Sequence, residues 1–143
     1  MIDGPVSVVA ADLDGDGDQD LVSSNQRSQD LTIFFQESPG SFASPPSHLS
    51  GVPPLDTPGA LAAADLEGDG DQDLVVVDEG SQDLRLFFQR TPGVFDPDPR
   101  ALAPATNFDP KSLVVNDLDG DGDQDLVSIN GFTNALTVFW GGR

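Results

Sequence analysis

The chain is poor in basic and redox-active side chains. Among its 143 residues are six lysines and arginines, one histidine and no cysteine. Without cysteine there are no disulfide bonds, thiolate metal sites or cysteine nucleophiles. Nucleic acids and anionic membranes are bound through lysine and arginine, so the net charge of −19 argues against both as partners. No apolar run is long enough to span a bilayer, and we predict no membrane insertion.

The sequence also lacks the usual parts of a catalytic centre, which needs a nucleophile with a base or an acid/base pair. The single histidine, His48, lies in a Ser/Pro-rich segment that we expect to be an exposed loop, and no G-x-S-x-G motif is present. We therefore predict that the chain is not an enzyme. Residues Met1–Pro5 have neither the basic nor the apolar region of a signal peptide. If the protein is secreted, we expect this sequence to be its mature form.

Acidic residues are abundant and are concentrated in one nine-residue stretch that occurs three times. The stretch carries carboxylates at positions 1, 3, 5, 7 and 9 and glycines at positions 4 and 6. Five carboxylates this close repel one another unless a cation neutralises them. Ca²⁺ does so with six to eight oxygen ligands at about 2.3–2.6 Å, and we predict three Ca²⁺ sites, one per stretch. The candidate ligands are Asp12, Asp14, Asp16, Asp18, Asp20, Asp65, Glu67, Asp69, Asp71, Asp73, Asp117, Asp119, Asp121, Asp123 and Asp125.

These stretches are not EF-hands. An EF-hand loop requires a bidentate Glu at position 12 and a helix on each side. Position 12 is occupied here by Ser23, Val76 and Ser128. The residues that follow each stretch are short and rich in β-branched side chains, which favours a strand.

The acidic stretches belong to a longer internal repeat with spacings of 53 and 52 residues. In each copy an apolar strand precedes the acidic stretch, a second strand follows it, and a third comes after a short polar turn. Proline-rich segments at 44–58 and 96–110 each have room for one short edge strand. No amphipathic helix pattern occurs. The predicted strands are 6–11, 21–25 and 31–35 in the first copy, 60–64, 74–78 and 84–88 in the second, and 112–116, 126–130 and 136–140 in the third.

About four strands in roughly 50 residues is the size of one β-propeller blade. The repeated D-x-D-x-D-G-x-x-D stretch between two strands resembles the FG-GAP/VCBS repeats of integrin α-subunit-like propellers. The resemblance implies Ca²⁺ between the first and second strands of each blade. It also implies ligation by the carboxylates at positions 1, 3, 5 and 9 and by the backbone carbonyl at position 7. Glu67 is one methylene longer than the Asp of the pattern, which predicts a looser or water-mediated middle site.

The predicted fold is all-β, with four-stranded antiparallel propeller blades at 1–58 and 59–110 and a third at 111–143 that lacks its fourth strand. These form one continuous propeller-like domain. Propellers need four to eight blades to close a ring. Three cannot close alone, so we expect either a piece of a longer protein or an assembly of copies, as a closed ring or an open head-to-tail stack.

Ca²⁺ binding without a bidentate Glu suggests affinity near extracellular Ca²⁺ levels, which favours a secreted or cell-surface location. We expect a calcium-stabilised structural or interaction module that assembles with itself, as a ring, tube or fibre, through open blade edges. The alternative is a fragment of a larger adhesion propeller that binds an extracellular protein or glycan. We expect Trp140 to pack in the core or between blades, and Arg85 to be a surface charge.

Overall fold

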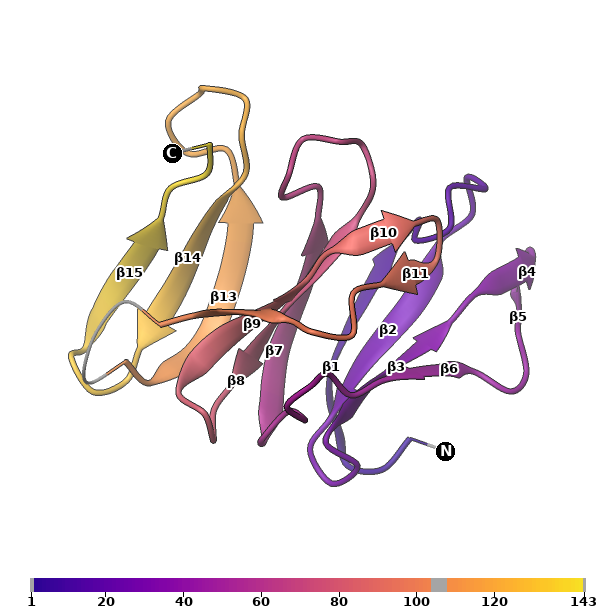
Figure 1. Cartoon of the computed structure of the whole chain (residues 1–143), viewed down its shortest axis with the longest axis horizontal. Coiled ribbons are helices and arrows are strands. Elements are labelled where there is room, and N and C mark those ends of the chain that lie inside the picture. The colour runs from indigo at the N-terminus through magenta and orange to yellow at the C-terminus, as the bar shows by residue number, and fades with distance from the viewer. Residues whose placement is uncertain (1, 104–107, 143) are drawn as a thin grey trace.

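The computed structural model describes residues 2–103 and 108–142, and every regular element within them is a β-strand. This confirms the all-β prediction. Most strands belong to three antiparallel sheets that stand side by side, one per sequence repeat (Figure 1). The predicted edge strands of the proline-rich segments are present as β6 and β12.

The strands of each sheet lie in chain order, and the first two sheets have a short fourth strand beside the third. The first sheet contains β1 (Pro5–Ala11), β2 (Asp20–Asn25), β3 (Asp30–Phe34) and β6 (Ser47–Leu49). The second, middle sheet contains β7 (Pro58–Ala64), β8 (Asp73–Asp78), β9 (Asp83–Phe87) and β12 (Arg100–Leu102). The third sheet contains β13 (Pro110–Asn116), β14 (Asp125–Asn130) and β15 (Ala135–Phe139). Two small hairpins consist of β4 (Gln36–Ser38) with β5 (Ser41–Phe42), and β10 (Gln89–Thr91) with β11 (Val94–Phe95).

The strand register places each acidic stretch in the loop between the first two strands of its sheet. The pairs that close these loops are Ala11–Asp20, Ala64–Asp73 and Asn116–Asp125. The last acidic residue of each stretch is thus the first residue of a strand. All three loops lie at the same end of the sheets, at the top of Figure 1.

Two apolar cores join the three sheets. The first lies between the first and middle sheets and includes Val22, Leu31, Leu74 and Phe87. The second lies between the middle and third sheets and includes Val75, Val77, Leu84, Leu86, Leu113 and Leu126. The first strands β1, β7 and β13 are also in contact from one sheet to the next. The middle sheet therefore has a neighbour on both faces, and every residue of β8 and β9 is buried.

Candidate metal centres

Each acidic loop is held in a tight conformation by its first carboxylate. In the first loop Asp12 accepts hydrogen bonds from the amides of Gly15 at 2.8 Å and Gly17 at 3.0 Å, one on each oxygen. Both glycines have left-handed backbone angles, with φ of 77° and 93°, which residues with a side chain rarely adopt. The same two bonds recur on Asp65 and Asp117. The glycines at positions 4 and 6 are thus explained by the backbone geometry of the loop.

The ninth position anchors the loop to the rest of the sheet. Asp20 is fully buried, and its two oxygens accept the amides of Leu13 at 2.8 Å and Gln36 at 2.7 Å. Asp73 and Asp125 are buried in the same way and have the equivalent bonds. Hydrogen bonds to an ionised carboxylate are stronger than neutral ones, so this residue ties its loop to the chain that follows the third strand.

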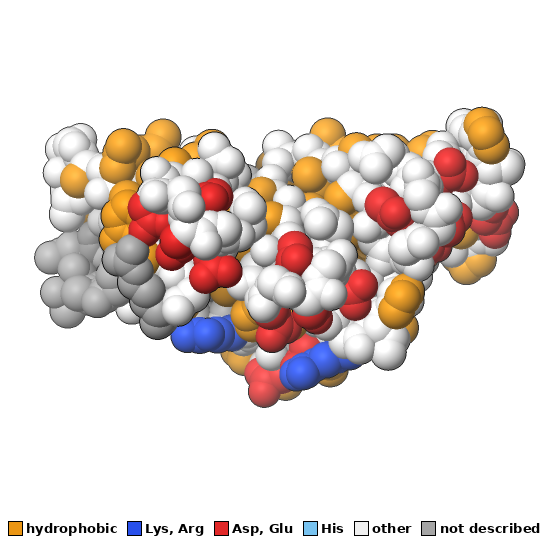
Figure 2. Space-filling model, turned by 90° about the horizontal axis from the view of Figure 1, so that it is seen from above, with side chains coloured by type: hydrophobic (Ala, Val, Ile, Leu, Met, Phe, Trp, Pro, Cys, Tyr) orange, Lys and Arg blue, Asp and Glu red, His pale blue; other side chains and the backbone are white. Residues whose placement is uncertain are grey.

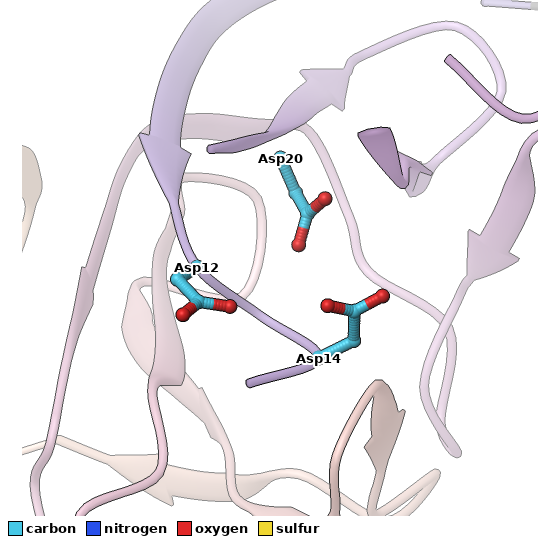
Figure 3. Close-up of side chains that lie close together, drawn as sticks. All are labelled: Asp12, Asp14 and Asp20. Carbon is cyan, nitrogen blue, oxygen red and sulfur yellow. The ribbon is translucent and has the colours of Figure 1, made fainter. Parts of the chain in front are cut away.

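Carboxylates from positions 1, 3 and 9 converge in the first and third loops. One oxygen from each of Asp12, Asp14 and Asp20 lies within 4.8 Å of the others (Figure 3). The same holds for the group Asp117, Asp119 and Asp125. Two oxygens that both ligate one Ca²⁺ at about 2.4 Å can lie up to about 4.8 Å apart. The spacing and the hard oxygen donors therefore fit this ion.

The middle loop differs. Among the described residues, Asp65, Glu67 and Asp73 do not form a group of this kind. In the first loop the amide of the fifth residue donates to the third, from Asp16 to Asp14 at 3.3 Å, and the third loop does the same. The amide of Asp69 donates instead to Asp65, at 3.1 Å. The longer side chain of Glu67 does not make the short-range bond that Asp makes at this position.

The fifth and seventh positions lie outside the three-carboxylate groups. Asp16 accepts the amide of Asp18 at 2.8 Å, and Asp121 accepts that of Asp123 at 3.0 Å. The equivalent bond in the middle loop joins Asp71 to Asp69 at 3.0 Å. These bonds form a series of Asx turns along each loop. Their role as Ca²⁺ ligands stays a prediction.

Burial, with a smaller contribution from neighbouring carboxylates, raises the pKa of two acids of the loops. Burial, followed by repulsion from Asp20 and Asp16, raises the pKa of Asp14. Burial also raises the pKa of Asp73, despite the amides of Gln89 and Leu66 that oppose the shift. Seen from the loop end, acidic side chains gather in separate patches over the three sheets (Figure 2). A cation between these carboxylates would remove the part of each pKa shift that comes from repulsion between the acids.

A second polar cluster surrounds His48, which lies in strand β6 and not in a loop. Its Nδ1 is 2.8 Å from Asp30 Oδ2 and 3.3 Å from Thr32 Oγ1. Burial raises the pKa of Asp30, but hydrogen bonds from Ser28, Asn25 and His48 outweigh it and lower the pKa. The hydroxyl and the carboxylate approach the same ring nitrogen, whereas a catalytic relay uses one on each. The cluster is therefore a structural network.

The middle sheet has a charged cluster at the equivalent place, and the expectation that Arg85 is a surface charge is wrong. Arg85 is buried, donates to Asp83 at 2.8 Å and lies 3.7 Å from Asp78. Asp78 Oδ2 is buried without a hydrogen-bond partner. Burial raises the pKa of both acids. Trp140 was expected in the core or between blades. It is 47% exposed and lines a groove between the middle and third repeats, with Leu66, Leu86 and Phe88 from the middle one.

The comparisons with known proteins agree with this picture of repeats. A family model described as an FG-GAP-like repeat matches residues 12–76 and again 65–128. Each match begins at the first carboxylate of one acidic loop and extends past the next loop. No curated protein matches the chain. The described part of the chain contains no helix long and apolar enough to cross a membrane.

Proposed function

Because the chain belongs to the FG-GAP-like repeat family, we propose that it is a calcium-stabilised structural or binding module built of propeller-type blades. Proteins with such repeats are generally structural or binding modules without enzymatic activity. The proposed blades are residues 1–58, 59–110 and 111–143. The observation that carries the proposal is the convergence of Asp12, Asp14 and Asp20, repeated in the third loop.

In this proposal Ca²⁺ supplies positive charge at the centre of each acidic loop. Asp12, Asp14 and Asp20 hold it in the first loop, and Asp117, Asp119 and Asp125 in the third. The amides that bind Asp12 and Asp20 orient these carboxylates before the ion arrives. The middle site, with Glu67 at its third position, is weaker. Folding and Ca²⁺ binding are therefore linked, because the unfolded chain does not hold the carboxylates together.

We place the module outside the cell. The loops have no bidentate Glu at position 12, a feature that favours affinity in the range of extracellular Ca²⁺. Self-assembly is the second part of the proposal, and large apolar side chains exposed on the first and third sheets support it. Binding of a foreign protein or glycan, the alternative, is supported by the family alone.

Thermal unfolding in millimolar CaCl₂ and in excess EGTA tests the calcium proposal. We expect a higher melting temperature in Ca²⁺, because a ligand that binds only the folded state stabilises it by about 2.7 kcal/mol at 100 times its Kd. Asp14→Ala should reduce the Ca²⁺-dependent increase. The matched control Asp98→Ala removes an exposed acid outside the loops and should keep the full increase. Equal melting temperatures of the wild-type protein in Ca²⁺ and EGTA would contradict the proposal.

A further inference from the structure

The middle sheet packs against the first sheet with one apolar face and against the third sheet with the other. We call the face toward the following sheet the tail face and the face toward the preceding sheet the head face. The repeat positions of Leu31 and Ile33 lie on the tail face. The positions of Leu61, Leu74 and Phe87 lie on the head face. These five side chains are buried together between the first and middle sheets.

The second junction uses the same repeat positions. Leu84 and Leu86, which are equivalent to Leu31 and Ile33, form the tail face of the middle sheet. They pack with Leu113, Leu126 and Phe139 on the head face of the third sheet. The chain thus builds one kind of face-to-face junction twice, from tail to head each time.

The tail face of the third sheet carries the same apolar pattern but has no described neighbour. Leu136 and Val138 occupy the positions of Leu31 and Ile33, and Leu136 is 68% exposed while Leu31 and Leu84 are fully buried. Ile129 and Val114 on the same face are also exposed. This sheet therefore presents a tail face without a head face against it.

The head face of the first sheet, in turn, has no described tail face packed against it. Val8, Leu21 and Phe34 occupy the positions of Leu61, Leu74 and Phe87, and Val8 is 67% exposed. These three side chains, with Ile2 and Val6, line a shallow groove of about 390 Å³. Exposed apolar patches of this kind mark interaction sites.

We infer that a second copy of this chain covers these faces, with the tail face of its third sheet docked on the head face of the first sheet. The inference rests on the self-assembly proposed above and specifies its surfaces: sheet faces, and not only the strand edges expected from the sequence. The occupant is another copy because the two bare faces are the two halves of the junction that the chain already forms internally. Such a contact is heterologous and builds a ring where the rotation closes, or a filament where it does not.

The same geometry makes the contact sensitive to Ca²⁺. At the internal junction the first and second acidic loops are neighbours, and Asp12 and Asp71 line one groove between them. A continued stack would place the third loop of one copy beside the first loop of the next. Without Ca²⁺ these acidic loops would repel each other, so we expect EGTA to weaken the assembly.

Two single variants test the direction of the contact. Val8→Lys introduces a charge on the bare head face, and Leu136→Lys introduces one on the bare tail face. Both positions are well exposed, and circular dichroism with the Ca²⁺-dependent melting temperature verifies folding. Val94→Lys, at an exposed apolar position in the β10–β11 hairpin, is the matched control. Molar mass is measured by light scattering in CaCl₂, for each variant alone and for an equimolar mixture of the two face variants.

We expect the wild-type protein and Val94→Lys to assemble, and each face variant alone to remain at 15.0 kDa. The mixture should form a species of twice that mass, since each variant keeps the face that the other has lost. Assembly of the single face variants, or a mixture that stays monomeric, would overturn the head-to-tail contact while self-assembly stands. A monomeric wild-type protein would overturn both and favour further blades of a longer chain as the occupants.

Discussion

The middle and third sheets share an apolar strand pattern but differ in exposure, most clearly in their third strands. Strand β9 reads Asp-Leu-Arg-Leu-Phe and is buried throughout, whereas β15 reads Ala-Leu-Thr-Val-Phe and is largely exposed. The apolar positions coincide, so the sequence pattern of both strands suits a sheet with two covered faces. Burial is decided by the neighbour that a sheet has, and not by the strand itself.

The largest difference should come from removing the same leucine in the two sheets. Leu84→Ala opens a cavity in the second core and should reduce the free energy of unfolding by about 2–5 kcal/mol. Leu136→Ala should change it by less than about 0.5 kcal/mol in the monomer, because this side chain is exposed. Urea unfolding at low protein concentration measures both values. Equal losses would mean that the two sheets are covered alike.

Ca²⁺ affinity should depend more strongly on the third residue of the acidic loop in the outer two sheets than in the middle sheet. Asp14→Ala and Asp119→Ala each remove a carboxylate from a converged group, and we expect roughly tenfold weaker binding at that site, or about 1.4 kcal/mol. Glu67→Ala should have a smaller effect, since Glu67 belongs to no converged group. Calorimetric Ca²⁺ titration of the three variants measures this order. A larger effect of Glu67→Ala would reverse the proposed ranking of the sites.

Replacing Asp78 of the charged cluster by the asparagine that the outer sheets have should increase the free energy of unfolding. Asp78 stands where the outer sheets have Asn25 and Asn130. In the first sheet Asn25 donates to Asp30 at 2.8 Å, and Asp78→Asn should donate to Asp83 in the same way. We expect a gain of about 1 kcal/mol at neutral pH, because the variant replaces a buried carboxylate oxygen that has no hydrogen-bond partner, while Arg85 loses its 3.7 Å contact with Asp78 but keeps the shorter one with Asp83 at 2.8 Å.

The gain from Asp78→Asn should depend on pH. Burial raises the pKa of Asp78 in the folded protein, so folding favours its protonated form. The penalty on the wild-type protein is therefore full above the folded-state pKa and fades as pH falls through that value toward the ordinary range. Urea unfolding at neutral and acidic pH checks the sign. A gain in the free energy of unfolding that becomes larger as the pH falls would contradict this sign.

The smallest effect should come from restoring the loop pattern. Glu67→Asp makes the middle stretch match the outer two at its third position, so the amide of Asp69 can bind residue 67 and release Asp65. We expect Ca²⁺ affinity at the middle site to rise by less than the tenfold loss above. Titration of this variant beside the wild-type protein measures the change, and a decrease would show that Glu67 suits its loop.

The short-range features of this protein were predictable from sequence. The strands and the position of each acidic loop follow from a pattern repeated within about 50 residues, and Glu67 alone indicated that the middle loop would differ. The buried network of Asp78, Asp83 and Arg85 was missed because a lone arginine in a strand has no sequence signal for its partners. His48 was missed for the same reason: its contact with Asp30 spans 18 residues across a sheet.

The most direct test of the account is the molar mass of the wild-type protein by light scattering, in CaCl₂ and then in excess EGTA. The account predicts an assembly well above 15.0 kDa in Ca²⁺ that dissociates in EGTA, because a second copy covers the bare faces and Ca²⁺ neutralises the neighbouring loops. A monomer of 15.0 kDa in both conditions would contradict it.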